Sequence, residues 1–360
     1  MKHSKLLKIM SLVVLIAMLA ACTPAAPQTV VQTVIVEKEG EVVEKLVTAE
    51  APPAMDKVTL RLNWMAYGSH AIFYYGRAMG FFEEQNIDLT IKEGNGSGNG
   101  VRLVANKDSD FAYGSASTML NLVTQGLPVK AVAQVDAMGT DACMCRPDSG
   151  ITDIKQLEGQ VVMTTAGAGV NTLFPVALLN AGVDIDKVNI TNVAEAALVS
   201  SYLQNLAPCI LAGIDDKPAQ IVAEGGDPPV IFPYSDYGVN QVGYAIVAHN
   251  DVIAQNPDLV KRFVAAVVKS MEASLADPDA AVAAMADWFP AEFENEADLL
   301  MARQQLDVTL SILTSPANKD KVLGYNPLED WESTLNIMKE YAELETDMTA
   351  DQFYTNEFLP

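Results

Sequence analysis

The feature that most constrains this chain is the stretch from Leu62 to Ile91, which has the pattern of a strand, a loop, a helix and a second strand. The first strand is expected to end at Asn63, and Trp64 then opens the loop. Gly80 follows the helix, where a glycine with positive φ commonly caps a carboxyl end. Small molecules bind in open α/β sheets where the carboxyl end of a strand faces the amino end of a helix. The stretch therefore predicts an α/β fold with a ligand site beside Trp64.

Strand-like and helix-like segments alternate through the middle of the chain. Short runs of alternating apolar and polar residues are typical of half-buried strands. Strands are expected at 57–62, 87–92, 110–114 and 129–135 in a first unit, and at 161–164, 188–193, 209–214, 230–233 and 242–247 in a second. The rest is mostly helical, with helix starts expected at Asn256, Asp277, Asn295 and Pro327. Two βα units followed by a helical tail predict that the chain returns to its first lobe.

The charge balance is strongly acidic, with 46 Asp and Glu against 23 Lys and Arg in 360 residues, a net charge of −23. Nucleic acid and anionic membrane surfaces attract basic proteins, so neither is expected as a partner. Half of the residues are hydrophobic, which is enough for sizeable cores, and the length suits two domains or one large one.

The amino terminus has the pattern of an export signal. Three lysines precede an apolar segment, 9–18, that is too short to span a membrane. Residues 19–22, Leu-Ala-Ala-Cys, then match a lipobox, whereas an ordinary signal peptide would leave Cys22 without a purpose. We therefore expect residues 1–21 to be removed as a lipoprotein signal peptide and Cys22 to be lipidated. The lipid alone would hold the protein on the extracytoplasmic face of the cell membrane.

Residues 22–56 predict a flexible tether. They are rich in Pro, Ala, Thr, Val and Glu, without aromatic residues and without a helical period. The run Val30–Val36 could pair as a strand, but the sequence names no partner for it. Globular structure is expected from Lys57 onward.

Three cysteines follow Cys22, and this odd number leaves at least one thiol unpaired. Cys143 and Cys145 are poorly spaced for a mutual disulfide, while either could bridge to Cys209. Buried or free thiols are the favoured interpretation. No metal site is expected, because the chain has three histidines and neither a CxxC nor an HxxxH spacing.

Three sets of motifs are spread over residues 57–360. The first is Leu62-Asn63-Trp64 with His70, Gly80-Phe81-Phe82 and Asn86-Ile87-Asp88; the others are Gly126–Val129, and Leu275–Pro278 with Tyr354–Leu359. Together they resemble the thiamin-pyrimidine-synthase-like family of the periplasmic-binding-protein superfamily. The resemblance implies a two-lobed type II α/β fold with a helical tail and crossovers near Pro147 and Ala248. Lobe 1 would then comprise residues 57–146 plus 249–360, and lobe 2 residues 147–248.

The same family includes an enzyme, the yeast-type pyrimidine synthase, which consumes pyridoxal phosphate and one of its own histidines, with iron. At the place of that enzyme's cofactor-binding lysine this chain has Gly114, and at the place of its sacrificial histidine it has Thr118. The enzyme's clustered cysteines fall at residues 235–244, which contain none here. No Schiff base can form without the amine. The chain is therefore expected to be a binding protein without a cofactor, and not an enzyme.

The expected site combines an aromatic wall with polar groups from both lobes. Trp64 would stack on a flat ligand, and the resemblance points His70 into the cleft, where a neutral imidazole can both donate and accept. Asp215 follows a strand and matches an acidic position of the family, whereas Asp216 is expected to be solvated. The other expected ligand contacts are Asn63, Ser115, Ser117, Thr118, Thr165, Gly167, Asn171, Glu195 and Tyr237, and for the three at 115–118 helix capping is an equal alternative.

None of the expected contacts is Arg or Lys, which disfavours sulfonate or nitrate as the ligand. A flat heterocycle with N–H donors and ring acceptors suits these side chains better. Riboflavin is slightly favoured over a thiamin-precursor aminopyrimidine, because a three-ring ligand would suit a wide aromatic supply: Trp64, Tyr67, Tyr74, Tyr75, Tyr113 and Tyr237. The resemblance implies a monomer that delivers its ligand to an ABC permease and ATPase made of other chains.

Overall fold

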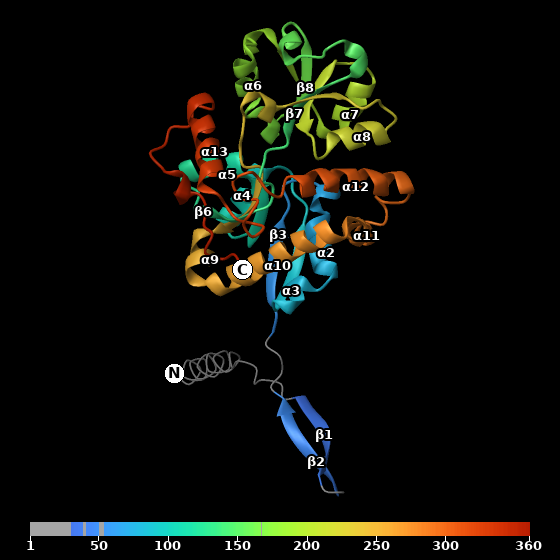
Figure 1. Cartoon of the computed structure of the whole chain (residues 1–360), viewed down its shortest axis with the longest axis vertical. Helices are drawn as coiled ribbons and strands as arrows, with labels where there is room; N and C mark the ends of the chain where they lie inside the picture. Colours follow the sequence, from blue (N-terminus) through green and yellow to red (C-terminus); the bar gives the residue numbers. More distant parts are fainter. Residues whose placement is uncertain (1–29, 39–40, 50–53, 167) are drawn as a thin grey trace, which may run out of the picture. The chain divides into compact units, whose positions relative to one another are not determined.

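The computed structural model describes residues 30–38, 41–49, 54–166 and 168–360, and the chain divides into two units, 1–54 and 55–360 (Figure 1). In the first unit, β1 (Val30–Lys38) pairs along its whole length with antiparallel β2 (Glu41–Ala49). The expectation of a coil is therefore wrong for these two strands, and β2 is the partner that the sequence did not reveal. The expected signal peptide and Cys22 lie outside the described residues.

The second unit contains two five-stranded sheets, and we call the part built on the first of them lobe 1. Its strand order is β4 (Ile87–Lys92), β3 (Asp56–Arg61), β5 (Phe111–Ser115), β12 (Tyr244–His249) and β6 (Val129–Gln134). β3 is parallel to β4 and β5, while β12 is antiparallel to β5 and β6. The helices that follow these strands are α2 (Ala71–Ala78), α3 (Phe81–Glu84), α4 (Ser97–Ala105) and α5 (Ala116–Thr124).

Lobe 2 is built on the other sheet. Its strand order is β11 (Val230–Pro233), β7 (Asp141–Cys145), β10 (Cys209–Gly213), β8 (Val161–Thr165) and β9 (Asn189–Val193), with helices α6 (Phe174–Ala181), α7 (Glu195–Leu203) and α8 (Lys217–Ala223). Cys145 and Cys209 face each other on neighbouring strands and form a disulfide, while Cys143 is buried and free. The favoured interpretation of buried or free thiols is therefore correct for Cys143 and wrong for Cys145 and Cys209, which form one of the two bridges that the sequence left open.

Both connections between the lobes lie earlier in the chain than the sequence predicted. β7 lies before Pro147 but belongs to lobe 2, and β12 begins four residues before Ala248 but belongs to lobe 1 along its whole length. The connections between the lobes therefore lie in 135–140 and 234–243, and the predicted crossovers near Pro147 and Ala248 need this correction. The reason is that a strand's alternation reports that one of its faces is buried but does not identify the sheet in which it pairs.

The carboxyl-terminal region is helical and returns to lobe 1, as the sequence predicts. It contains α9 (Asn250–Gln255), α10 (Pro257–Ala276), α11 (Pro278–Trp288), α12 (Glu296–Ser311) and α13 (Leu328–Tyr341). The side chains of Asn256, Asp277 and Asn295 accept backbone N–H groups at the starts of α10, α11 and α12, which confirms these expected helix starts. Near the end of the chain, the carbonyl of Phe353 accepts the N–H of Ala131 in β6.

Short 3-10 helices complete the second unit. They are η1 (Gly68–His70), η2 (Pro147–Ser149), η3 (Ile154–Leu157), η4 (Gly169–Asn171), η5 (Ile185–Lys187), η6 (Tyr234–Tyr237) and η7 (Ala350–Gln352). α12 packs against η1 of lobe 1 and also against α8 of lobe 2, so this helix contacts both lobes (Figure 1). Within the described residues, no helix is both long and apolar enough to cross a membrane.

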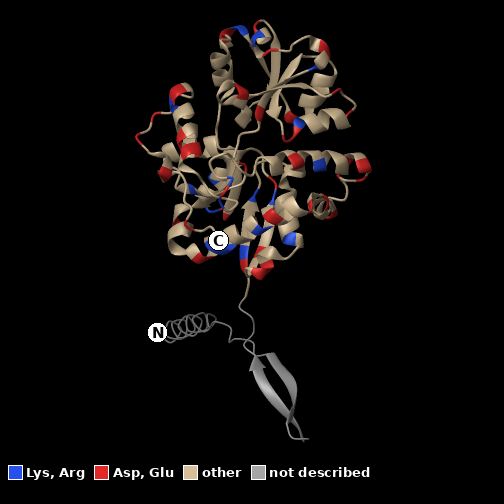
Figure 2. Cartoon of the chain, in the orientation of Figure 1, with Lys and Arg blue, Asp and Glu red and all other residues tan. Residues whose placement is uncertain are grey.

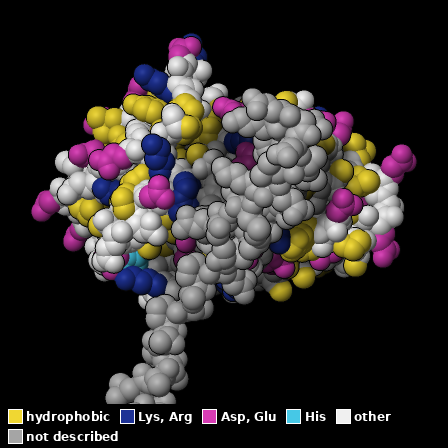
Figure 3. Space-filling view, turned by 90° about the horizontal axis from the view of Figure 1, so that it is seen from below, with side chains coloured by type: hydrophobic (Ala, Val, Ile, Leu, Met, Phe, Trp, Pro, Cys, Tyr) yellow, Lys and Arg dark blue, Asp and Glu magenta, His cyan; other side chains and the backbone are white. Residues whose placement is uncertain are grey.

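Acidic side chains are distributed over both lobes (Figure 2). On the face shown in Figure 3, acidic, basic and hydrophobic side chains are interspersed rather than gathered by type. Inside lobe 1, Phe111 of β5 stacks on Phe263 of α10 with their ring centroids 3.9 Å apart, and this pair joins the sheet to its covering helix.

Candidate functional site

A cavity of about 110 Å³ lies between the two lobes. Lobe 1 contributes the end of β3 with the loop that follows it, the start of α4 and the first residue of β12; lobe 2 contributes the ends of β8 and β10 and the starts of α7 and α8. The cavity wall includes Asn63, Trp64, Tyr67, Ser97, Asp141, Thr165, Ala168, Gly169, Glu195, Asp215, Asp216, Lys217 and Tyr244. Strand ends and helix starts thus surround the cavity, as in other open α/β sheets that bind small molecules.

Trp64 is half-buried on the cavity wall, and a glycine-rich segment, residues 94–100, holds its loop in place. The N–H of Gly94 donates to the carbonyl of Trp64 at 2.9 Å, and the N–H of Gly96 donates to the carbonyl of Asn63 at 2.8 Å. A Cβ at Gly94 would lie 2.0 Å from the carbonyl oxygen of Leu62, so only glycine allows these backbones to approach. These two amides therefore support the loop and are not free to receive a ligand.

His70 is fully buried and is absent from the cavity wall, so the expectation that it points into the cleft is wrong. Its Nδ1 accepts the N–H of Tyr67 at 3.3 Å, which leaves the proton on Nε2, and Nε2 donates to Oδ1 of Asn63 at 2.6 Å. Burial lowers the pKa of His70 to about 3, so the ring is neutral at ordinary pH. His70 therefore positions two residues of the wall, Asn63 and Tyr67, and does not meet the ligand itself.

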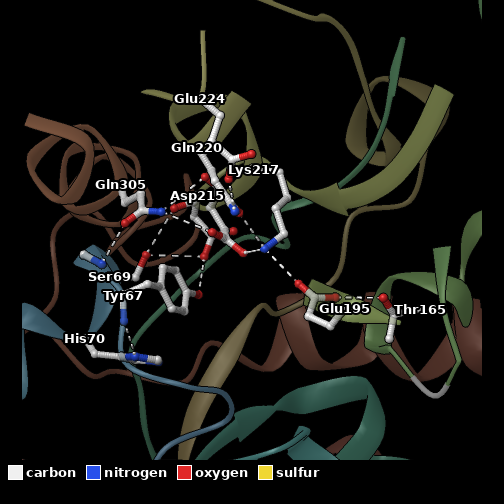
Figure 4. Close-up of polar contacts among 12 residues, drawn as sticks. Tyr67, Ser69, His70, Thr165, Glu195, Asp215, Lys217, Gln220, Glu224 and Gln305 are labelled. Carbon is white, nitrogen blue, oxygen red and sulfur yellow. Dashed lines mark hydrogen bonds and ion pairs between the residues drawn. The ribbon is translucent and has the colours of Figure 1, made fainter. Parts of the chain in front are cut away.

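Hydrogen bonds join the two lobes along one side of the cavity (Figure 4). The hydroxyl of Tyr67 donates to Oδ2 of Asp215 at 2.6 Å, and Ser69 Oγ lies 3.4 Å from the same oxygen. Gln305 of α12 accepts the N–H of Gly68 at 2.9 Å and donates to Oδ1 of Asp216 at 3.1 Å. Burial and the Asp215 carboxylate raise the pKa of Tyr67 well above its ordinary value, so its hydroxyl keeps the proton that it donates.

A lysine lies on the cavity wall, which corrects the expectation of a site without cations. Nζ of Lys217 lies 2.8 Å from Oε1 of Glu195 and 2.8 Å from Oδ2 of Asp216, and Thr165 Oγ1 donates to Oε2 of Glu195 at 2.8 Å (Figure 4). Burial by itself would lower the pKa of Lys217, but the two carboxylates outweigh it and hold that pKa above its ordinary value. Asp216 is therefore paired rather than solvated, and the ammonium is already neutralised.

The lining as a whole is acidic, because four carboxyl groups face one ammonium. They belong to Asp141, Glu195, Asp215 and Asp216. Asp141 accepts Nε2 of Gln241 at 2.9 Å, and burial raises its pKa to about 6. A ligand with N–H groups or positive charge would fit this wall better than an anion.

A second cavity of about 390 Å³ shares Ser97, Ala168 and Gly169 with the first. The expected residues Ser117, Thr118 and Asn171 lie on its wall, although Asn171 Nδ2 already donates to the carbonyl of Thr165 at 2.8 Å. Ser115 lines neither of the two cavities; its Oγ lies 3.0 Å from that of Ser117.

Two of the expected contacts remain. Tyr237 lies in η6, packs against the lobe 2 core and lines neither cavity, so its expected place in the cleft is wrong. Gly167 lies outside the described residues.

The sequence did not single out Lys217 or Tyr244 as wall residues, and it named Tyr67 only among the aromatic residues available to a flat ligand. Lys217 follows β10 two residues after Asp215, so the strand-end argument that selected Asp215 applied equally to it. Tyr244 was hidden because its strand was expected in lobe 2. Fewer aromatic residues line the first cavity than the sequence suggested. Of the six that were proposed, Trp64 and Tyr67 line it, whereas Tyr74 and Tyr113 are buried in the core.

The positions that distinguish a binding protein from the synthase can now be located. Gly114 lies in β5, where an added Cβ would lie 3.3 Å from Cγ2 of Val101, so a larger side chain would require Val101 to move. Thr118 lies at the start of α5. In the described part of the chain the histidines are His70 and His249, both buried, and His249 caps α9 through its Nδ1.

Comparison with known proteins gives several similar sequences. The riboflavin-binding protein RibY of Chloroflexus aurantiacus is 24% identical over 86% of this chain and 88% of its own length. The formylaminopyrimidine-binding protein of Halalkalibacterium halodurans is 20% identical over 86% of this chain and 92% of its own. The 4-amino-5-hydroxymethyl-2-methylpyrimidine phosphate synthase THI11 of Saccharomyces cerevisiae is 23% identical over 84% and 88%. Relatives at this distance thus include two proteins named for binding and one named as an enzyme.

Solved structures with the same fold include periplasmic binding proteins. The aliphatic sulphonate-binding protein SsuA of Escherichia coli has a TM-score of 0.65 at 13% identity, over 82% of this chain and 91% of that protein. The nitrate-binding protein NrtA of Synechocystis has a TM-score of 0.60 at 15% identity, over 84% and 87%. The two-lobed α/β fold expected from the sequence is thereby confirmed. Since the model of the family described as NMT1/THI5 like matches residues 68–281, the chain belongs to that family.

Proposed function

We propose that this protein is the lipid-anchored substrate-binding component of an ABC importer, which captures a flat aromatic heterocycle and delivers it to a membrane permease. One observation carries the proposal: an interlobe cavity whose wall combines Trp64 with polar groups from both lobes. Closure of two lobes on a ligand changes the surface that a permease meets, and this population shift couples binding to delivery.

The charge of the wall argues against sulfonate or nitrate, the ligands named for SsuA and NrtA. An anion would need a cation or several amides free to receive it. Lys217 is held by two carboxylates, and Asp215 adds a further negative charge opposite Tyr67. A neutral or cationic heterocycle carrying N–H donors therefore suits the cavity better.

Among heterocycles we favour riboflavin. RibY is named as a riboflavin-binding protein, and Trp64, Tyr67 and Tyr244 give the wall three aromatic side chains. A thiamin-precursor aminopyrimidine is the second candidate, supported by the small volume of the first cavity and by the relative named for formylaminopyrimidine.

Binding is preferred to catalysis because the chain lacks the groups that the synthase reaction needs. A glycine replaces the cofactor-binding lysine at Gly114, and Thr118 cannot replace a sacrificed imidazole. Incubation with pyridoxal phosphate and iron should yield neither imine absorbance nor a pyrimidine product, and turnover would overturn this assignment.

The test of ligand class is a titration followed by tryptophan fluorescence. Riboflavin stacked on Trp64 should quench the emission in a saturable manner, and Trp64→Phe should abolish that quench. Trp288→Phe is the matched control, because Trp288 is 49% exposed beneath the Arg77 guanidinium and lines neither interlobe cavity. A saturable response to an aminopyrimidine alone would select the second candidate. A response only to sulfonate or nitrate would refute the aromatic site.

A further inference from the structure

The second cavity is an extension of the first, away from the hydrogen bonds that join the lobes. Its walls come from α4 and α5 of lobe 1, from η4 of lobe 2 and from Met338 of α13. The interlobe bonds of Tyr67 and Gln305 lie instead beside α12. α12 and α13 lie on opposite sides of the second unit in Figure 1. A ligand in the first cavity can therefore extend toward α13, away from these bonds.

The two cavities differ in charge. The second has no carboxylate among its lining residues and one cation, Arg102. Nη1 of Arg102 donates to the carbonyl of Gly98 at 3.2 Å, and this guanidinium forms no ion pair with any described residue. Hydroxyl and amide side chains also line this wall, among them Ser117, Thr118 and Asn121, together with apolar Leu122 and Met338. The cleft thus runs from an acidic end to an end with a free cation.

The sizes of the cavities suggest how a ligand would use them. Ligand pockets commonly enclose about 300–1,000 Å³. The first cavity, at about 110 Å³, is below that range, whereas the second adds about 390 Å³. A ring system placed against Trp64 with a chain leading past Ser97 would occupy both.

We propose that the second cavity is a subsite for a polar chain carried by the ring, and that Arg102 there binds a phosphate group at the end of the chain. This rests on the proposed function and names its substrate class: a flavin whose hydroxylated chain can be phosphorylated. The hydroxyls of Ser117 and Thr118 can bond to those of the chain, and a planar guanidinium matches the oxygens of phosphate. Arg102 is exposed, so the phosphate would keep part of its hydration while bound.

The experiment compares three ligands on the full chain by titration calorimetry: lumichrome, which has a tricyclic ring without the chain; riboflavin; and flavin mononucleotide. Riboflavin should bind more tightly than lumichrome, and flavin mononucleotide at least as tightly as riboflavin. Arg102→Gln should weaken flavin mononucleotide about five- to tenfold, allowing for solvent screening, and leave riboflavin and lumichrome nearly unchanged. Thr118→Val should weaken both chain-bearing ligands and spare lumichrome.

Lys107→Gln is the matched control, since it removes the same charge from an exposed site that pairs with Asp251 and lies outside both cavities. If it weakens flavin mononucleotide as much as Arg102→Gln, the effect is one of general charge and the phosphate contact is refuted. Equal binding of lumichrome and riboflavin would refute the subsite while leaving flavin recognition in place. If none of the three flavins binds, the proposed riboflavin function falls, and this inference falls with it.

Discussion

At the scale of single residues, His70 and Asp141 have opposite effects on stability in mildly acidic solution. The pKa of His70 falls to about 3 in the fold, so from about pH 6.5 down to 3 the unfolded chain takes up a proton that the folded chain refuses. Stability is then lost on acidification. The pKa of Asp141 rises to about 6, so between about pH 3.8 and 6 the folded chain holds the extra proton. That contribution grows on acidification and partly offsets the loss from His70.

One substitution removes the stabilisation that Asp141 contributes on acidification. Asp141→Asn keeps an acceptor for Gln241 but cannot titrate. Its free energy of unfolding should therefore fall more steeply than that of the unmodified protein between pH 6 and 4, by up to about 1.4 kcal/mol per pH unit. Urea unfolding at several pH values measures this. Parallel pH profiles for the two proteins would show that Asp141 ionises normally in the fold.

At the scale of elements, a hydrogen bond joins the residue before η1 in lobe 1, Tyr67, to Asp215, which lies between β10 and α8 in lobe 2. Tyr67→Phe removes the hydroxyl that donates to Asp215 and leaves that carboxylate with Ser69. A hydrogen bond to a charged group contributes about 1.5–3 kcal/mol. If the bond forms only when the lobes are closed, its loss should weaken ligand binding roughly tenfold, because about 1.4 kcal/mol is a factor of ten.

Small-angle scattering and a binding titration together test this prediction, and the ligand-free variant should have a larger radius of gyration. Tyr202→Phe is the control, since the hydroxyl of Tyr202 is buried in lobe 2 without a hydrogen-bond partner among the described residues. Unchanged affinity and unchanged dimensions in Tyr67→Phe would show that other contacts determine closure.

At the scale of the whole molecule, the lipobox predicts how the protein is held. Cys22→Ser removes the thiol that would be acylated, so the protein should appear in the medium or remain as the unprocessed, longer chain. Fractionation followed by mass determination distinguishes these outcomes. Normal processing with unchanged membrane association would show that something other than lipid on Cys22 holds the chain. Cys143→Ala is the control, because it removes a thiol elsewhere in the chain.

The sequence by itself determined most of the strand and helix order after residue 56 and the loop of Trp64 that meets the cavity, but neither β2 nor β7 was expected. The two-lobed class followed from the resemblance of its motifs to a known family. Alternating and helical periods depend on local residues, so the helix starts at Asn256, Asp277 and Asn295 could be predicted from capping side chains alone. Trp64 could also be placed on the wall, because it lies in the loop that follows β3.

Only the tertiary structure decided which strands pair and which polar groups are used internally. β12 pairs antiparallel between β5 and β6, so Tyr244 reaches the cavity from a strand expected in the other lobe. His70 forms hydrogen bonds with Asn63 and Tyr67, and Lys217 forms ion pairs with Glu195 and Asp216. The physical reason is shared: a residue type fixes what a side chain can donate, accept or bury, but its partner comes from residues far along the chain that folding brings near.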